Sequence, residues 1–218
     1  MKKFITTLTL QPNASSSLEL PYEYDPSCGF YYDRAIRNPI IPFIRQNTIA
    51  GEEIGVYLIV EDKSVNTEAG QTHLENFKSE LDMIRAQNEF VCGEVKQIVL
   101  HAPQNSAEYM RLVKALIDVV EDGDTIYADM TYGRKAVPIA QFIALNYVYK
   151  IRQDVEIGTL SYGEAHNPGP DGKAKPTVFD LSGFFLLNDA IGNIAGDEQA
   201  GEHLESAIVN LIKLMERM

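Results

Sequence analysis

The sequence predicts an α/β fold in which helices flank a mainly parallel β-sheet. Two observations lead to this prediction. Short apolar runs rich in branched residues, which are typical of buried parallel strands, recur along the chain. Amphipathic stretches with helical spacing lie between them. Strands and helices that alternate in this way form parallel sheets with right-handed connections.

The first strand is expected at 3–10, where apolar and polar residues alternate. Residues 11–38 then form a long polar connection. Its five aromatic residues leave two roles open, stacking on bases or packing of the loop onto its own domain. A short helix is expected within 39–50, followed by a strand at 53–60 and an amphipathic helix at 68–89.

The second half of the chain continues this pattern. The segment 177–181 is expected to return antiparallel to the strand before it, which gives a C-terminal β-hairpin. The other strands are expected at 95–100, 125–130 and 155–162, and the helices at 106–120, 136–149, 184–194 and 202–218. The helix at 136–149 has no charged residue and is apolar on all sides. It is therefore buried either within its own chain or against a second subunit.

Composition narrows the class of protein. A chain of 218 residues, 45% hydrophobic and 23% charged, can form a sizeable core, and we expect one domain over 1–218. The net charge of −12 argues against a nonspecific binder of long DNA or RNA, but not against a small phosphate ligand in a local cationic pocket. The last helix, about 198–218, either packs back on the domain or links it to an effector domain beyond Met218.

Cysteines and histidines give no sign of a metal site. Only Cys28 and Cys92 are present, without metal-ligand spacing, and the four histidines form no zinc motif. We expect no metal and no cofactor. Two distant cysteines indicate a reducing compartment. The N-terminus lacks the features of a signal peptide, and no apolar run approaches the ~20 residues that span a bilayer. The sequence thus predicts a cytoplasmic protein without membrane contact.

Residues 129–138, Asp-Met-Thr-Tyr-Gly-Arg-Lys-Ala-Val-Pro, join a strand to a helix and have the features of an anion site. Free N–H groups and the helix dipole attract anions at a helix start. Thr131 can donate a hydroxyl hydrogen bond, Gly133 lets the backbone approach a ligand, and Arg134 with Lys135 adds charge. The alternative is an ordinary strand–turn–helix junction with solvated cations. The segment is neither a P-loop nor a Gly-x-Gly-x-x-Gly fingerprint.

Parallel sheets bind ligands beyond the carboxyl ends of their strands. The turn at 9–13 follows the first strand, and the turn at 131–135 follows the strand at 125–130. We therefore expect these two turns on the same rim of the sheet. No pair of carboxylates stands out for acid–base chemistry, and no catalytic residue is identified.

The segment 129–138 resembles the Asp-Ile-Thr-His-Gly-Phe-Arg-Ser-Leu-Pro signature of CRISPR-associated Rossmann-fold (CARF) proteins. Four residues match in register: Asp129, Thr131, Gly133 and Pro138. Lys135 stands where the family has an arginine, whereas Tyr132 replaces a histidine and Arg134 replaces an aromatic residue. Segments 38–43 and 178–182, the latter after a strand end at 161–163, are also similar, so the resemblance covers most of the chain.

The resemblance implies a Rossmann-like fold and a homodimer that binds one cyclic oligoadenylate across its two-fold axis. Binding in type III CRISPR antiviral signalling would regulate an effector beyond Met218 or on another chain. The residues expected to bind the ligand are Thr9, Gln11, Asn13, Thr131, Tyr132, Gly133, Arg134 and Lys135. Two alternatives stay open: a metal-independent ring nuclease that cleaves the ligand, and an unrelated α/β nucleotide-binding domain.

Overall fold

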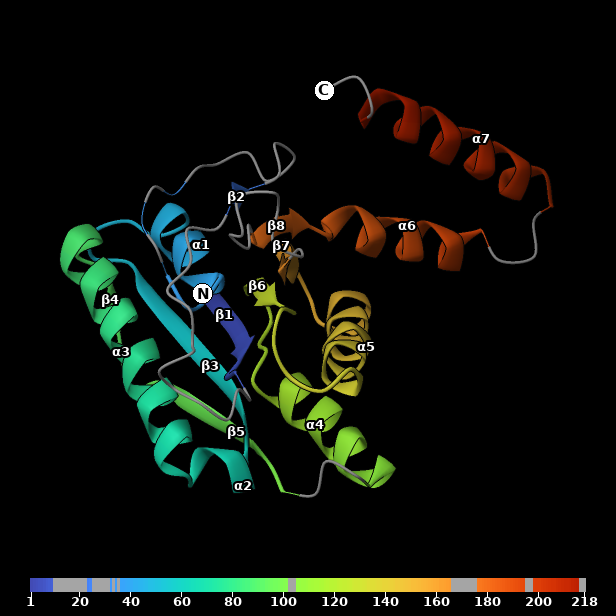
Figure 1. Ribbon diagram of the computed structural model, residues 1–218. Coiled ribbons are helices and arrows are strands. Elements are labelled where there is room, and N and C mark those ends of the chain that lie inside the picture. The colour runs from blue at the N-terminus through green and yellow to red at the C-terminus, as the bar shows by residue number, and fades with distance from the viewer. Residues whose placement is uncertain are drawn as a thin grey trace, which may run out of the picture.

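The computed structural model describes residues 1–9, 23–24, 32, 34, 36–101, 105–165, 176–194 and 198–215 (Figure 1). Strands and helices alternate over most of this length. The strands are β1 (Lys2–Thr7), β2 (Glu23–Tyr24), β3 (Glu53–Glu61), β4 (Val91–Cys92), β5 (Lys96–Leu100), β6 (Thr125–Asp129), β7 (Glu156–Ala165) and β8 (Pro176–Asp180). The helices are α1 (Ile40–Gln46), α2 (Asp62–Val65), α3 (Glu68–Asn88), α4 (Ser106–Asp118), α5 (Ala136–Ile151), α6 (Ser182–Asn193) and α7 (Glu198–Met215).

All these strands belong to one sheet, in the order β2-β8-β7-β6-β1-β3-β4, with β5 also paired to β3. The five main strands β7, β6, β1, β3 and β5 run parallel to one another. Only β8 runs antiparallel to its neighbour β7, as predicted for the C-terminal hairpin. The expected Rossmann-like α/β fold with a mainly parallel sheet is confirmed. The short elements β2, β4 and α2 were not predicted from the sequence.

The strand order reverses between β1 and β6. The chain passes from β1 to β3 and β5 on one side, then returns to β6 and β7 on the other side of β1. At such a switch point the connections leave β1 and β6 in opposite directions, and a crevice forms beyond their carboxyl ends. The topology therefore directs attention to the residues that follow Thr7 and Asp129.

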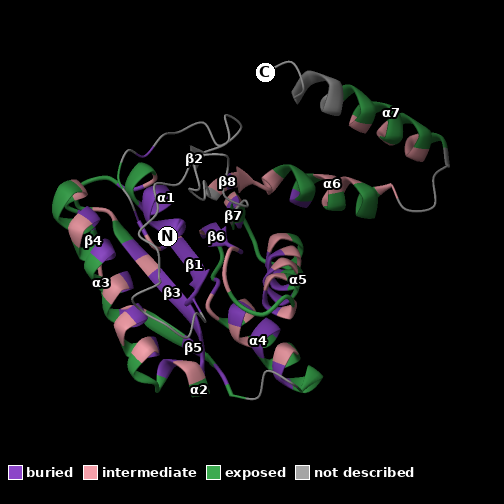
Figure 2. Cartoon of the chain, in the orientation of Figure 1, coloured by how far each residue is buried: buried purple, intermediate pink, exposed green. Residues whose placement is uncertain are grey.

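The sheet carries a hydrophobic core on each face (Figure 2). Successive side chains of a strand point to opposite faces, so Phe4 joins one core and Ile5 the other. Helices α1 and α3 cover the first face, and α4, α5 and α6 cover the second. The phenyl ring of Phe185 on α6 makes edge contacts with the rings of Phe142 and Tyr149 on α5.

Helix α5 is buried on one side only. Its outward face exposes a stripe at intervals of four residues: Ile139 (61% exposed), Ile143 (51%), Tyr147 (47%) and Ile151 (64%). Of the two alternatives for the burial of this helix, burial within the chain accounts for one side only, because four large apolar side chains stay exposed. Burial of this stripe against a second subunit stays a prediction. We call these four residues the α5 stripe.

Helices α6 and α7 project from the edge of the sheet where β8 lies (Figure 1). Between Gln199 and Asn210, no described side chain of α7 is buried. Within the described residues, no helix is long and apolar enough to cross a membrane. The same part of the chain holds no group of three or more histidine, cysteine or acidic side chains arranged to bind a metal ion.

Candidate functional site

The carboxyl ends of β1 and β6 and the middle of β7 meet around the carboxylate of Asp129. This side chain has no exposed surface. Thr6 Oγ1 donates to Asp129 Oδ2 at 2.9 Å. Thr131 Oγ1 at 2.5 Å and Ser161 Oγ at 3.2 Å both donate to Oδ1. Asp129 thus links the ends of β1 and β6 to β7 at the switch point.

Burial raises the pKa of Asp129 to about 6, because a carboxylate without solvent is costly to ionise. The hydrogen bonds from Thr131, Thr6 and Ser161 act in the opposite direction, since they stabilise the charged form. Burial is the larger effect. The carboxyl group therefore changes its protonation state around pH 6.

Gly133 forms the turn between Asp129 and α5. Its φ of 100° lies in the left-handed region, which side chains other than glycine seldom adopt. A Cβ atom at this position would lie 2.9 Å from Thr7 Cγ2 and 3.3 Å from Val137 Cβ. Glycine therefore lets the turn lie directly against the end of β1 and the first turn of α5.

The first turn of α5 offers unused hydrogen-bond donors. No side chain caps this helix, and within the described residues no backbone hydrogen bond uses the N–H of Lys135 or Ala136. Lys135 is exposed and has no hydrogen-bond or ion-pair partner in the part of the chain that the structure describes. Free N–H groups, the helix dipole and an ammonium group together favour an anion.

Thr7 is a second, independent sign of a ligand. It ends β1 and contacts the Gly133 turn, and it is only 4% exposed. Its hydroxyl has no hydrogen-bond partner among the described residues. A buried hydroxyl without a partner is unfavourable, so a ligand oxygen at this position would satisfy it.

Two neighbours of Lys135 in the turn are already engaged. Arg134 makes a bidentate ion pair with Glu61 at the end of β3, with Nε donating to Oε1 at 2.6 Å and Nη2 to Oε2 at 3.2 Å. The hydroxyl of Tyr132 donates to the carbonyl oxygen of Arg37 at 2.7 Å. Lys135 is thus the residue of this turn whose charge is free for a ligand.

Two of the segments that carry the family resemblance, 38–43 and 129–138, meet at Gly163, and Val178 of the third segment pairs with Gly163 across β7 and β8. The N–H of Gly163 donates to Thr131 Oγ1 at 2.8 Å, and a Cβ atom on Gly163 would lie 3.3 Å from Pro39 Cγ. Asn38 is held by Glu80, which accepts hydrogen bonds from its backbone N–H and its side-chain amide. Residues 38–43, 129–138 and 161–163 therefore form one structure around Thr131.

The predicted ligand-binding residues are placed as follows. Thr131, Tyr132, Gly133, Arg134 and Lys135 form the turn between β6 and α5, and Thr9 lies just beyond β1, largely buried. Gln11 and Asn13 lie outside the described residues. Sequence reasoning missed Thr7 and Glu61 as site residues. Glu61 directly follows the strand predicted at 53–60, which is the signal that could have found it, whereas Thr7 lies inside the strand predicted at 3–10 and ends the shorter β1 of the structure.

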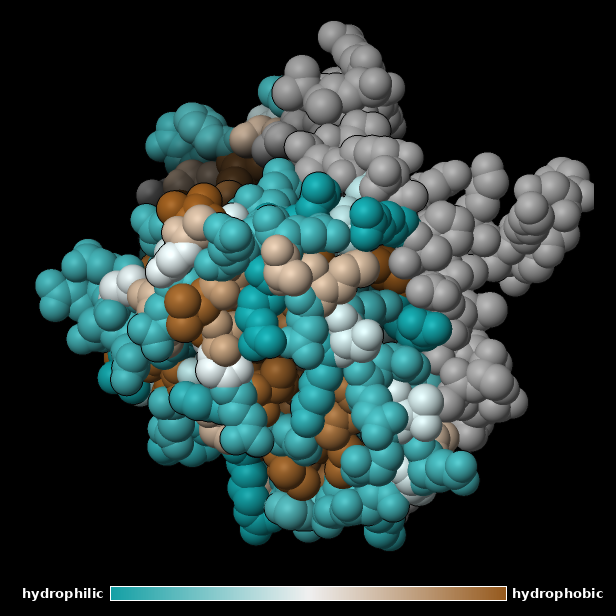
Figure 3. All heavy atoms as spheres, turned by 90° about the vertical axis from the view of Figure 1, so that its left-hand side faces the viewer, coloured by the Kyte–Doolittle hydropathy of each residue, from teal (hydrophilic) through white to brown (hydrophobic). Residues whose placement is uncertain are grey.

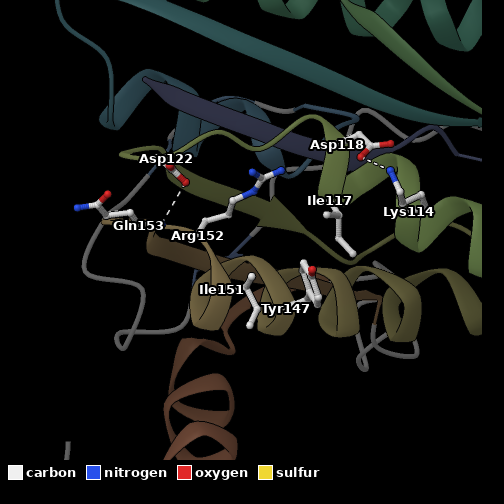
Figure 4. A pocket seen from close by; sticks show the side chains of 8 residues that line it. All are labelled: Lys114, Ile117, Asp118, Asp122, Tyr147, Ile151, Arg152 and Gln153. Carbon is white, nitrogen blue, oxygen red and sulfur yellow. Dashed lines mark hydrogen bonds and ion pairs between the residues drawn. The ribbon is translucent and has the colours of Figure 1, made fainter.

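A second hollow, of about 390 Å³, lies at the opposite edge of the sheet, where β6 and β7 begin (Figure 4). Residues of α4 and α5 line it, and Ile117, Tyr147 and Ile151 face it. Part of its polar lining is already paired: Lys114 with Asp118, and the N–H of Gln153 with Asp122 Oδ1 at 3.1 Å. The switch point, with its unpaired donors, is the better candidate for a ligand site.

A scan against models of known protein families finds no match, and no curated protein is significantly similar to this sequence.

Proposed function

We propose that this chain is a CARF-like sensor that binds a cyclic oligoadenylate across a homodimer in type III CRISPR antiviral signalling. The observation that carries the proposal is the set of unpaired donors at the switch point. Lys135, the start of α5 and the Thr7 hydroxyl are all available there. Unpaired donors of this kind suit the phosphate oxygens of a nucleotide.

Each subunit would bind one phosphate of the ring. A charge-assisted hydrogen bond from Lys135 contributes roughly 1.5–3 kcal/mol, and Thr7 adds a neutral donor in a site shielded from water. The net charge of −12 does not oppose this, because charges in solution are screened beyond about 10 Å, whereas Lys135 contacts the phosphate directly.

The α5 stripe supports the homodimer. It begins at Ile139, one turn of helix beyond Lys135. If two copies packed antiparallel around Ile139 and Ile143, each Lys135 would lie about 9 Å along the helix from the two-fold axis. With helices about 8–10 Å apart, the two Lys135 positions on the helix axes would be about 20 Å apart, and their long side chains could reach inward toward one ligand. A ring of several nucleotides can bridge such a gap, and a mononucleotide cannot.

The resemblance favours a cyclic oligoadenylate over other phosphate ligands. Two of its segments, 38–43 and 129–138, meet at Gly163, and the third adjoins Gly163 through Val178, as expected if they serve one site. In this function the protein is cytoplasmic. The ligand would bind the two arrangements of the dimer with different affinity and so regulate an effector domain beyond Met218 or on another chain.

Native mass spectrometry with cyclic tri-, tetra- and hexa-adenylate tests the proposal. We expect one ring per two chains, a preference for one ring size, and much weaker binding of AMP and ATP. Linear products during incubation would instead assign the chain as a ring nuclease. A monomer that binds ATP as well as any ring would identify an unrelated α/β nucleotide-binding domain.

A further inference from the structure

The hydrogen bonds of Thr131 are fully assigned when Asp129 is ionised. A carboxylate only accepts hydrogen bonds, and a backbone N–H only donates them. Thr131 must therefore give its one hydroxyl hydrogen to Asp129 Oδ1, at 2.5 Å, while its oxygen accepts from the N–H of Gly163, at 2.8 Å. In this state Thr131 has no hydrogen left to donate to a phosphate.

A proton on Asp129 reverses the direction of this bond. The carboxyl O–H can then donate to Thr131 Oγ1, whose second lone pair still accepts from Gly163. The hydroxyl hydrogen of Thr131 becomes free and can turn outward, since Thr131 is only partly buried. Thr6 and Ser161 keep donating to the two carboxyl oxygens, so the rest of the cluster is preserved.

We propose that Asp129 is a positioning residue that couples phosphate binding to the uptake of one proton from solvent. The bound phosphate accepts the hydroxyl hydrogen bond of Thr131. The hydrogen bond between Thr131 and Asp129 is then kept by the new proton, which Asp129 donates to Thr131 Oγ1. Protonation also removes a buried negative charge from beneath the anion. This inference rests on the phosphate site described above.

The surroundings of Asp129 leave it as the group that titrates. The side chains that face it from β1, β7 and α5 are Thr6, Ser161 and Gln141, none of which ionises near neutral pH. The charged or titratable groups nearby are Tyr132, Arg134 and Lys135 in the turn and Glu61 at the end of β3. Arg134 and Glu61 neutralise each other. Because burial raises the pKa of Asp129 to about 6, protonation at neutral pH reduces the affinity of one site only by about tenfold, compared with roughly a thousandfold for a solvated aspartate.

Calorimetric titration with cyclic tetra- and hexa-adenylate, in two buffers of different ionisation enthalpy, measures the uptake directly. Phosphodiester groups stay ionised near neutral pH, so they do not take up the proton, and the Asp129→Asn variant shows whether Asp129 does. At neutral pH we expect uptake that approaches one proton per phosphate site. Because two sites take up protons for each ring, the Kd should also rise by up to about a hundredfold per pH unit above the pKa of Asp129.

Two comparisons separate this coupling from a structural role: Asp129→Asn against the parent, and Thr131→Val against Thr131→Ser. Asp129→Asn cannot take up a proton and should bind without uptake and without the pH dependence. Thr131→Val should also lose the uptake, whereas Thr131→Ser keeps the hydroxyl and should retain it, which tests the idea even if Asp129→Asn does not fold. Binding by the parent without proton uptake, or uptake that persists in Thr131→Val, would overturn the inference and leave the proposed function standing. Absence of binding at every pH would count against the proposed function itself.

Discussion

Helices α3 and α5 cover opposite faces of the same sheet, but they differ in the side chains that they turn outward. The exposed positions of α3 are polar except for Ala86: Glu68, Gln71, Glu75, Lys78, Ser79, Asp82, Arg85 and Gln87. On the α3 side of the molecule hydrophilic side chains predominate and separate the hydrophobic patches (Figure 3). The exposed positions of α5 are the α5 stripe and Lys150.

The difference shows which face is complete in a single chain. The outer face of α3 is polar and is hydrated without any protein partner. The α5 stripe exposes four large apolar side chains, and exposed apolar surface of this kind marks interaction sites. The stripe also starts beside the unpaired donors of the switch point. The α5 face therefore carries both the proposed ligand site and the proposed subunit contact, and the α3 face provides matched controls.

The largest effect is expected from a charge in the α5 stripe. Ile143→Glu would bury one unpaired carboxylate per subunit in the dimer contact, at about 2 kcal/mol each, and so weaken dimerisation by roughly 1000-fold. Sedimentation equilibrium at micromolar concentration should show a dimer for the parent and a monomer for the variant. Gln71→Glu on α3 is the control and should stay dimeric. A parent protein that is monomeric with and without ligand would refute the shared site.

Removal of the Lys135 ammonium group should have the next largest effect. Lys135→Ala loses one charge-assisted contact in each subunit, so we expect ring binding to weaken on the order of a hundredfold or more. The salt dependence of binding should also flatten, and folding should barely change. Lys78→Ala, an exposed lysine on α3, should leave binding unaltered.

Arg134→Ala is the control within the turn. Arg134 is paired with Glu61, so its loss should weaken binding less than the loss of Lys135. If Arg134→Ala abolishes binding while Lys135→Ala does not, the arginine leaves Glu61 for the ligand, and our assignment of the two cations is reversed.

Asp129 should make stability depend on pH in an unusual direction. Folding raises its pKa from 3.8 to about 6, so the folded chain holds this proton more tightly than the unfolded chain does. The contribution to stability is complete below the unfolded pKa and is lost as pH rises from about 4 through 6, by about 3 kcal/mol in all. Chemical unfolding across this range should show the loss in the parent but not in Asp129→Asn. Parallel pH profiles for the two proteins would show that the carboxyl group stays ionised in the fold.

The smallest effect is expected from the turn glycine. Gly133→Ala places a side chain at positive φ and 2.9 Å from Thr7 Cγ2, which should cost about 1–3 kcal/mol of stability. Gly93→Ala is the control, because nothing lies within 4 Å of its added Cβ. Thermal melts of both variants compare them directly. An equally stable Gly133→Ala would show that the turn relaxes away from β1.

Much of the fold could be predicted because hydrophobic periodicity is a local property. The helix expected at 68–89 is found at Glu68–Asn88, and the strand expected at 53–60 at Glu53–Glu61. The two-residue strands β2 and β4 were missed, since pairs this short have no periodic signal. The exposure of the α5 stripe could not be predicted either. An apolar helix looks the same in sequence whether its outer face meets the core or a second chain.

The site could be predicted only where it is continuous in sequence. Residues 129–138 contain the turn, its glycine and its cations, and the glycine and the start of α5 lie where they were expected. The partners Thr6, Glu61 and Ser161 come from other strands and meet Asp129 or Arg134 only through the strand order. The sequence likewise suggested that Thr131 is a free donor, whereas its hydroxyl is engaged by Asp129.

The stoichiometry of ring binding tests the central claim most directly. Isothermal titration of the unmodified chain with the cyclic oligoadenylate that binds in mass spectrometry should end at half a ring per chain, because two copies of the α5 start and two Lys135 side chains form one site. A titration that ends at one ring per chain would contradict the shared site, and the absence of binding by any ring would contradict the proposed function.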